Sequence, residues 1–595
     1  MKQLMTGNEA IARGAWEAGV FFASAYPGTP STEILQNLTT YKEIDAEWAP
    51  NEKVAMEAAI GASIGGARAM ASMKHVGVNV ASDPLHTFSY TGVNGGMVLV
   101  GADEPGQHSS QNEQDNRWVA KMAKIPMLEP SDSQECKDMM GIGFEISEKY
   151  DTPVFFRVTT RICHSKSIVE CGDRTEVGVK EYVKQTEKYV TVPLFARKRR
   201  VIVENRMEEL LKYSESTPLN RIEKGNGEIG VIACGVCYQY AKEIFGDEAS
   251  YLKLGFTSPL PKQKIKEFCE QVKTVYVIEE NDPYIEETVL MLGFEAKLKG
   301  KNVLPKYGEL MPDVLRKSIY GKNNKTIDYD RSKILPRPPT LCAGCPHRGF
   351  FYDIGRRKNI VITGDIGCYS LGYAEPYNAM DSNVCMGAAF SAAHGTQKIF
   401  SGPGKNEKRV VGVMGDSTFF HTGMNSLLEV VYNNSKTICV ILDNAITGMT
   451  GHQNTPGNGL NARGEPANVT SIEAVVRALG IKNVTTVDPN DLTKMKEAMD
   501  WALSLDEPSV IITRFPCVLK RITKEEKVEF NNPFTSKSKV NTEKCVGCKL
   551  CLRSGCPALS FETASKKAKI ASVQCVGCTV CNQICPKQAI EKEGK

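Results

Sequence analysis

The chain has 595 residues, 42% of them hydrophobic and 24% charged, with a formal net charge of +4. This composition is typical of a globular protein with several domains, and it indicates neither nucleic acid nor a membrane surface as a partner. No apolar run reaches the roughly 18 residues that a membrane span requires. Charged residues interrupt positions 1–19, so we expect an amphipathic helix there and not a signal peptide.

Short apolar runs alternate with helical patterns over most of the chain. Continuous apolar strands bounded by Gly and Asp are typical of parallel sheets that are covered on both faces, so the prediction is an α/β fold. The strands are expected at 77–82, 97–103, 152–161, 229–235, 275–280, 409–416 and 436–444.

Three stretches have the composition of linkers. Residues 185–206 are polar and basic, residues 335–340 read LPRPPT, and residues 524–541 are polar and charged. Proline disfavours both helix and strand, which makes the second of these the clearest boundary. The linkers divide the chain into four segments, which are residues 1–190, 191–334, 335–535 and 536–595.

A candidate metal and diphosphate site follows two of the predicted strands. The first ends in Gly415-Asp416-Ser417, and the second ends in Asp443-Asn444. Between them, apolar residues at helical spacing predict a helix with one buried face (Met424, Leu427, Leu428 and Val431). Strand, loop, helix and strand place Asp416 and Asn444 at the carboxyl edge of a parallel sheet, where ligands bind. Together with a backbone carbonyl near Ile446, two phosphate oxygens and a water molecule, they would complete the octahedron that Mg²⁺ requires.

The last segment holds a repeated cysteine pattern. Of the twenty cysteines, eight lie between 545 and 585, which suits a reduced, cytoplasmic protein that binds metal. The second run has the C-x2-C-x2-C-x3-C-P spacing of bacterial ferredoxins, in which the fourth cysteine of each run binds the other 4Fe–4S cluster. We therefore assign one cluster to Cys545, Cys548, Cys551 and Cys585, and the other to Cys556, Cys575, Cys578 and Cys581.

The first run departs from this pattern, because four residues separate Cys551 from Cys556. The alternative interpretation, a pair of zinc sites, favours separated C-x2-C pairs over C-x2-C-x2-C triplets. Residues 540–595 carry nine Lys and Arg against four Asp and Glu. These charges either steer an acidic electron carrier or offset the negative charge of the clusters.

Several segments resemble known motifs. The stretch from Gly-Asp-Ser to Asp-Asn resembles the thiamine diphosphate (ThDP) motif, in which Gly-Asp-Gly and Asn-Asn are usual. YPGTPSTEI at 26–34, GDIGCYS at 364–370 and ITGMTGHQ at 446–453 are similar to segments of the 2-oxoacid:ferredoxin oxidoreductases. LCAGCPHR at 341–348 and the irregular first cysteine run are most similar to the large (alpha) subunit of the indolepyruvate type. This resemblance covers nearly the whole chain.

The resemblance implies a fold and a reaction. Residues 1–190 would form the pyrimidine-binding ThDP domain, 191–334 a middle α/β domain like the transketolase C-terminal domain, and 335–535 the diphosphate and Mg²⁺ domain. Residues 536–595 would form an α+β two-cluster ferredoxin domain. The implied activity is oxidative decarboxylation of an aryl 2-oxoacid with coenzyme A and ferredoxin. A smaller beta subunit is the implied partner.

The resemblance also implies roles for single residues. A carboxyl group must bond the aminopyrimidine ring of ThDP, and Glu52 stands where the family places it, with Glu57 as the alternative. Thr29 is a candidate for bonding the substrate, or else caps its loop. Arg117 is a candidate partner of the substrate carboxylate, although a surface arginine is the simpler expectation. Gly415, Ser417 and Cys368 would lie against the cofactor.

A third cluster remains open at this point. Cys342, Cys345, Cys368 and Cys517 occur in the order in which related oxidoreductases hold a cluster near ThDP. The alternative is that subunits of the indolepyruvate type lack this cluster and that Cys342 and Cys345 line the cofactor site. His347 and His421 lie in the same motif loops.

Two other functions also remain open. A non-oxidative ThDP lyase would not need the ferredoxin-type cysteines, and an electron-carrier subunit would not need Asp416.

Overall fold

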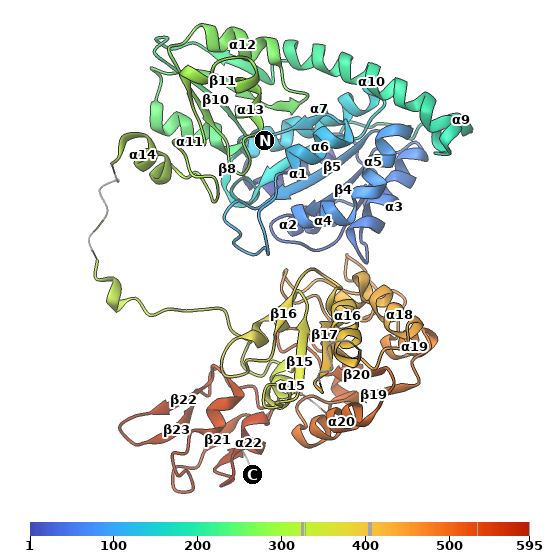
Figure 1. Ribbon diagram of the computed structural model, residues 1–595, viewed down its shortest axis with the longest axis vertical. Coiled ribbons are helices and arrows are strands. Elements are labelled where there is room, and N and C mark those ends of the chain that lie inside the picture. Colours follow the sequence, from blue (N-terminus) through green and yellow to red (C-terminus); the bar gives the residue numbers. More distant parts are fainter. Residues whose placement is uncertain (323–326, 328, 403–406, 532, 594–595) are drawn as a thin grey trace. The chain divides into compact units, whose positions relative to one another are not determined.

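A computed structural model describes residues 1–322, 327, 329–402, 407–531 and 533–593. The chain forms two compact units, Met1–Tyr329 and Asp330–Lys595 (Figure 1). The α/β prediction is confirmed in both of them. Among the described residues, no helix combines the length and the apolar character needed to traverse a bilayer.

The first unit is built on a seven-stranded sheet in the order β12-β6-β7-β5-β4-β2-β3. Only β12 pairs antiparallel, with β6, while the other strands run parallel. Every side chain of β5 and β7 is buried, because helices cover both faces. The strands are β2 (Phe22–Ala25), β3 (Asp45–Trp48), β4 (Ala69–Lys74), β5 (Met97–Asp103), β6 (Met127–Leu128), β7 (Val154–Thr159) and β12 (Phe256–Ser258).

Two helices of this layer matter most for the site. Helix α3 (Glu52–Ile64) begins where β3 ends, with the side chain of Asn51 accepting from the Val54 amide as its cap. Helix α6 (Asn116–Ala123) is capped in the same way by Asp115. The remaining helices are α1 (Gly7–Glu17), α2 (Thr32–Leu38), α4 (His75–Val80), α5 (Ser82–Thr91), α7 (Ser133–Tyr150) and α8 (Thr160–His164).

A second sheet of the first unit has five strands in the order β14-β13-β10-β11-β9. Its strands are β9 (Asn220–Glu223), β10 (Ile229–Cys234), β11 (Ser250–Leu254), β13 (Thr274–Ile278) and β14 (Leu298–Lys299). Helices α11 (Val236–Phe245), α12 (Lys262–Glu270), α13 (Tyr284–Met291) and α14 (Pro312–Tyr320) connect and flank them. Strand β12 belongs to this segment in sequence but pairs with β6 at the edge of the seven-stranded sheet. It therefore connects the five-stranded and seven-stranded sheets.

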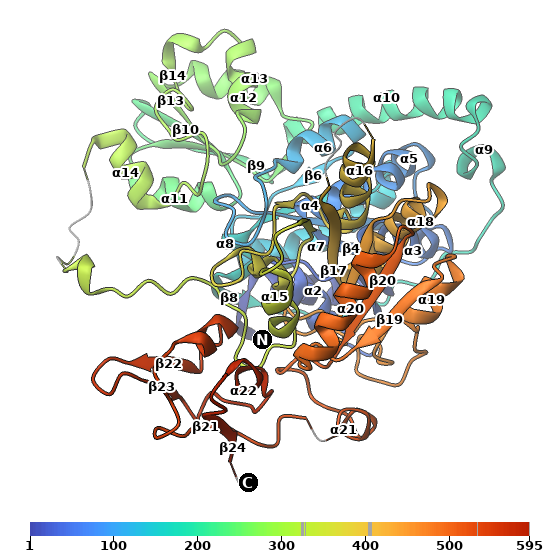
Figure 2. The same cartoon turned by 60° about the horizontal axis from the view of Figure 1, so that its bottom comes forward.

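The second unit contains a parallel six-stranded sheet in the order β16-β15-β17-β18-β20-β19 (Figures 1 and 2). Separate apolar cores lie on its two faces. The strands are β15 (Ile360–Gly364), β16 (Ser382–Asn383), β17 (Arg409–Gly415), β18 (Ile438–Asp443), β19 (Asn483–Val487) and β20 (Ser509–Arg514). The main helices are α15 (His347–Ile354), α16 (Ala389–Ser401), α18 (Met424–Tyr432), α19 (Ile472–Ala478) and α20 (Leu492–Ser504).

The C-terminal part of this unit, shown in red in Figure 2, consists of two small antiparallel ribbons. One pairs β21 (Ser538–Val540) with β24 (Ile590–Lys592), and the other pairs β22 (Leu559–Glu562) with β23 (Lys567–Ile570). Helix α22 (Val580–Ile584) and a short 3-10 turn at Leu550–Ser554 complete it. This is the α+β module that the cysteine pattern predicts.

Some expected elements are different in the structure. The run at 77–82, predicted as a strand, is mostly helix α4, since a short apolar run does not separate strand from buried helix. Much of the linker predicted at 185–206 is helix: α9 (Thr186–Tyr189) precedes α10 (Pro193–Ser216). Helix α10 buries only a narrow stripe, which its charged residues obscure in the sequence (Val203, Arg206, Leu210 and Ser214).

The ends of other predicted segments also differ in detail. The N-terminal helix α1 is preceded by strand β1 (Lys2–Thr6), which pairs with β8 (Lys166–Glu170). Helix α21 (Lys524–Glu529) forms inside the third predicted linker, where Thr523 and Glu526 make a capping box.

Candidate functional site

The motif residues of the second unit meet at the carboxyl edge of β17 and β18. These strands are parallel neighbours, with Gly415 opposite Leu442, so the residues that follow each strand lie together. Asp416, Asp443 and Asn444 are all buried there. Gly415 is in close contact with the ring of Tyr369: a Cβ at this position would come within 2.6 Å of it.

The charges of this edge are not balanced by the protein alone. The Oδ2 atom of Asp416 is buried and has no hydrogen-bond partner among the described residues. Burial, and then the neighbouring carboxylate of Asp443, raise the pKa of Asp416 well above its ordinary value. Arg514 Nη1 lies 3.5 Å from Asp443 Oδ2 and offsets part of that charge. An unpartnered carboxylate oxygen beside an amide oxygen is a donor set that fits Mg²⁺.

The loop after β18 is held by side-chain contacts. Asn444 Oδ1 accepts from the backbone amide of Ile446 at 3.2 Å. The hydroxyls of Ser417 and Thr447 are hydrogen-bonded at 2.8 Å. These contacts join the two halves of the motif and keep its amide oxygen next to Asp416.

Both motif histidines are buried near this edge. His347 Nε2 lies 3.4 Å from the Asn444 Nδ2 atom, and burial lowers the pKa of His347 to about 4, so its ring is neutral at neutral pH. His421 lies in a π-helical turn at Phe419–Gly423, with Nδ1 3.1 Å from the hydroxyl of Thr422. Such turns are frequent at functional sites.

Sequence reasoning missed a third aspartate at this sheet edge. The carboxylate of Asp365, which follows β15, accepts from the backbone amides of Gly387 and Ala389. Burial raises its pKa to about 6. Asp365 thus holds the loop that enters α16. Asp365 stands directly after a strand, as Asp416 does, and it belongs to the segment GDIGCYS. This position is the signal by which the sequence could have revealed it.

Four cysteines gather beside the same edge. Burial raises the pKa of the Cys368 thiol to about 11, and the nearby thiols of Cys517 and Cys342 contribute to this shift. Burial also raises the pKa of the Cys345 thiol, and the thiols of Cys368 and Cys517 contribute to that rise. The backbone amide of Cys517 donates to the carbonyl oxygen of Asn444 at 3.0 Å, which ties this group to the metal motif.

In the first unit, the two candidate glutamates have different surroundings. Glu52 is the first residue of α3 and is only 6% exposed, packed against the backbone of Gly77 in α4. Glu57 is exposed and forms an i,i+4 ion pair with Lys53. Of the two, Glu52 is buried in the unit and Glu57 lies on its surface.

Thr29 lies partly buried in the loop between β2 and α2. This loop is packed closely against β4, since a Cβ at Gly28 would lie 3.3 Å from the Lys74 side chain.

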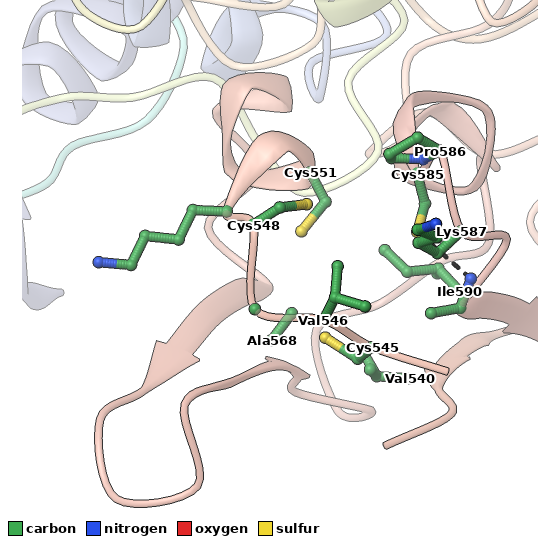
Figure 3. A pocket seen from close by; sticks show the side chains of 13 residues that line it. Val540, Cys545, Val546, Cys548, Cys551, Ala568, Cys585, Pro586, Lys587 and Ile590 are labelled. Carbon is green, nitrogen blue, oxygen red and sulfur yellow. Dashed lines mark hydrogen bonds between the residues drawn. The ribbon is translucent and has the colours of Figure 1, made fainter. Parts of the chain in front are cut away.

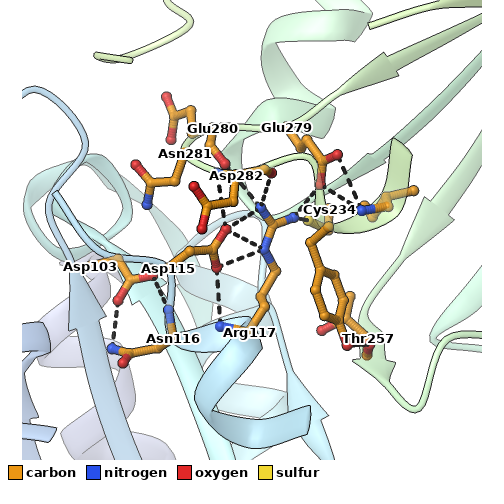
Figure 4. A network of polar contacts seen from close by, with 12 residues as sticks. Asp103, Asp115, Asn116, Arg117, Cys234, Thr257, Glu279, Glu280, Asn281 and Asp282 are labelled. Atoms are coloured by element: carbon orange, nitrogen blue, oxygen red, sulfur yellow. Dashed lines mark hydrogen bonds and ion pairs between the residues drawn. The ribbon is translucent and has the colours of Figure 1, made fainter. Parts of the chain in front are cut away.

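Arg117 lines a pocket of the first unit, but its guanidinium is already paired with carboxylates. Its guanidinium is 0% exposed and binds Asp115, two residues earlier, at 2.5 Å and Glu279, which follows β13, at 2.5 Å. It also donates to the carbonyl oxygens of Glu280 and Asp282 (Figure 4). A buried arginine saturated by two carboxylates joins the two sheet layers. In this structure it is not available to a substrate carboxylate, nor is it the surface residue that its type suggests.

The eight C-terminal cysteines surround two separate cavities. One is lined by Cys545, Cys548, Cys551 and Cys585 (Figure 3). The other is lined by Cys556, Cys575, Cys578 and Cys581. In each cavity three thiols come from one run and the fourth comes from the other run. Thiol groups distributed over the walls of a cavity in this way fit a four-iron cluster.

Three known families match successive parts of the chain. Residues 13–208 match the thiamine-diphosphate-binding region of pyruvate flavodoxin/ferredoxin oxidoreductases. Residues 365–513 match the C-terminal binding domain of thiamine pyrophosphate enzymes. Residues 537–586 match the 4Fe–4S dicluster domain. The chain therefore combines thiamine diphosphate domains with a module for two 4Fe–4S clusters.

Curated relatives match over the full length. The indolepyruvate oxidoreductase subunit IorA of Archaeoglobus fulgidus is 40% identical, over 99% of this chain and 97% of its own. The subunit of the same name from Methanothermobacter thermautotrophicus is 40% identical over 100% and 98%. A solved 2-oxoglutarate:ferredoxin oxidoreductase from Magnetococcus marinus matches 50% of this chain and 61% of its own at 19% identity, with a TM-score of 0.42. On the full-length matches, the chain belongs to the IorA family of indolepyruvate oxidoreductase subunits, within the 2-oxoacid:ferredoxin oxidoreductases.

Proposed function

We propose that this chain catalyses the oxidative decarboxylation of an aryl 2-oxoacid, with indolepyruvate as the substrate, coenzyme A as the acyl acceptor and ferredoxin as the electron acceptor. The observation that carries the proposal is the combination, within one chain, of the Asp416 edge and two cavities that are each lined by four cysteines. The aryl substrate rests on the names of the full-length relatives.

Within the second unit, the residues around β17 and β18 would hold the diphosphate. Asp416, Asn444 and the carbonyl oxygen of Ile446 would bind Mg²⁺. Gly415 and Ser417 would lie along the phosphates, and Cys368 beside the cofactor. Thiamine diphosphate supplies, when bound, an electron sink that allows a 2-oxoacid to lose CO₂. Asp416, Asn444 and Ile446 are all buried, so these oxygen ligands lie in a poorly solvated part of the unit.

In the first unit, Glu52 would hold a proton at the aminopyrimidine ring. Its burial at the start of α3 supports this role, and Thr29 would bond the substrate. Arg117 stays a candidate only if its ion pairs open, and we assign it instead to joining the sheet layers.

The cysteines would carry electrons out of the site. We assign one cluster to Cys545, Cys548, Cys551 and Cys585, and the other to Cys556, Cys575, Cys578 and Cys581. The proximity of Cys342, Cys345, Cys368 and Cys517 supports a third cluster beside the Asp416 edge. Ferredoxin and a smaller second subunit would be the protein partners. None of the twenty cysteines, which all lie among the described residues, forms a disulfide in the structure, which favours a reducing, cytoplasmic setting.

An anaerobic assay of the chain with its partner subunit tests the substrate. We expect coenzyme A-dependent reduction of viologen or ferredoxin to be fastest with indolepyruvate, then phenylpyruvate, and slower with pyruvate and 2-oxoglutarate. Faster turnover with either of the small oxoacids would overturn the aryl assignment. Product formation without any acceptor would instead indicate a non-oxidative lyase.

Gly77→Ala tests the position of Glu52. A Cβ at Gly77 would lie 2.6 Å from Cγ and 2.7 Å from Oε1 of Glu52, so the carboxyl group must move. We expect the turnover rate to fall by about 100-fold, since a displacement near 1 Å has that effect on positioned groups. The control is Gly61→Ala in α3, where a Cβ meets nothing within 4 Å. Equal turnover rates for the two variants would contradict the role of Glu52.

A further inference from the structure

We propose that Arg348 is the positioning residue and the buried counter-charge of the inner ferredoxin-type cluster, the one assigned to Cys556, Cys575, Cys578 and Cys581. Arg348 is only 1% exposed and lines the cavity of these cysteines. The proposal rests on the proposed function insofar as that cavity holds a 4Fe–4S cluster.

Arg348 joins two cysteine-bearing loops of the second unit. On one side its Nε donates to the carbonyl oxygen of Cys342 at 2.8 Å, and its Nη2 donates to the carbonyl oxygen of Leu341. On the other side its Nη1 donates to the carbonyl oxygen of Ser554 at 3.2 Å. One guanidinium therefore fixes the loop of Cys342 and Cys345 against the loop that precedes Cys556.

The irregular spacing of the first cysteine run explains how Ser554 reaches this contact. Four residues separate Cys551 from Cys556, and the last of them, Gly555, has a φ of +62°. The Ser554 carbonyl also accepts from the hydroxyl of Tyr377 at 2.6 Å. A Cβ at Gly555 would lie 2.7 Å from that hydroxyl oxygen, so this position has no room for a side chain.

Other contacts hold the same two regions together. Gly344 packs against Val576, and a Cβ at Gly344 would lie 2.1 Å from a methyl group of that side chain. The Gln583 side chain donates to the carbonyl oxygen of Asn490 at 2.7 Å and accepts from the Leu492 amide at 3.0 Å. The inner cavity is thereby placed against the body of the unit. The lining of the outer cavity comes from residues 540–590 only.

The charge of Arg348 has no acidic partner in the described part of the chain. Its four hydrogen-bond acceptors there are three backbone carbonyl oxygens and the phenol oxygen of Tyr377. Burying a guanidinium without an anion is strongly unfavourable. A cluster ligated by four thiolates is anionic, and the cavity that Arg348 lines is where such a group would lie.

This arrangement has a redox consequence. One-electron reduction adds one negative charge to a cluster, and no bond forms or breaks. A fixed positive charge in a poorly solvated site stabilises the reduced form more than the oxidised form. Arg348 would therefore raise the reduction potential of the inner cluster relative to that of the outer one, and hold it at a fixed separation from Cys342 and Cys345.

The test is a redox titration of the full-length chain with its clusters. A chemical reductant sets the potential, and electron paramagnetic resonance monitors the reduction of each cluster. In Arg348→Gln we expect the potential of one cluster to fall while that of the other keeps its wild-type value. Arg348→Lys and Tyr377→Phe keep the charge, so both potentials should remain near wild type. Arg553→Gln is the matched control, because it removes an exposed arginine from the 3-10 turn that contains Ser554.

Unchanged potentials in Arg348→Gln, with a full complement of iron, would overturn the proposal. So would an equal fall in Arg348→Lys, because the charge would then not be the cause. If Arg348→Gln loses iron, the result for Arg348→Lys becomes decisive. Wild-type iron content and wild-type potentials in Arg348→Lys would support the proposal, and loss of iron from Arg348→Lys would overturn it. The titration uses no 2-oxoacid, so it is independent of the substrate assay.

Discussion

Replacement of Glu52 by Gln is expected to slow oxidation of the oxoacid substrate by about 10²- to 10⁴-fold, the range over which positioned acid–base groups contribute. Gln is nearly the same size as Glu, so the packing against Gly77 and the cap at Asn51 should remain. The amide, however, holds no transferable proton for the aminopyrimidine ring. Steady-state rates and cofactor binding, measured separately, check this result.

Glu57→Gln is the control for this experiment. It makes the same chemical change one and a half turns along the same helix, but at an exposed residue that is paired with Lys53. We expect a wild-type turnover rate and only a small loss in the free energy of unfolding, since an exposed ion pair of this spacing contributes about 0.3–0.5 kcal/mol. If the Glu57 variant were the inactive one, or both were equally active, the role of Glu52 would be wrong.

The part of the fold that sequence reasoning predicts best is the buried parallel strands. Strands β5, β10, β13, β17 and β18 lie within the predicted runs, or within one residue of them, because strands covered on both faces read as continuous apolar segments. Helices α4 and α10 are not predicted in this way. Their few buried positions emerge only when other elements pack against them, and a single sequence does not contain that information.

The residues of the candidate site also differ in how far the sequence alone predicts their contacts. Local spacing is sufficient to group Asp416 with Asn444, because adjacent parallel strands bring their ends together. It is not sufficient for Arg117, whose second carboxylate, Glu279, is 162 residues away. The role of Arg348 is also missed, since its acceptor at Ser554 lies 206 residues further along the chain. Contacts of this length depend on how whole layers pack.

The second large effect is expected when either ferredoxin-type cluster is removed. Loss of the inner cluster and loss of the outer cluster should affect the two electron acceptors differently. Cys581→Ser removes a ligand of the inner cavity, which lies next to the loop of Cys342 and Cys345. Electrons would then not pass beyond the group of Cys342, Cys345, Cys368 and Cys517, so ferredoxin reduction should be lost and viologen reduction should fall strongly. Cys548→Ser affects the outer cavity, where Cys548 is exposed. Ferredoxin reduction should be lost there too, while viologen can still accept electrons from the inner cluster.

Iron content and both acceptor assays, run on the same preparations, check this difference. Cys439→Ser serves as the control, because Cys439 is buried in β18 away from both cavities and should leave the iron content unchanged. If Cys548→Ser abolished viologen reduction while Cys581→Ser retained it, the order of the two clusters would be reversed. If both variants kept full ferredoxin reduction, the module would lie outside the electron path, and Arg348 would have no cluster in that path to tune.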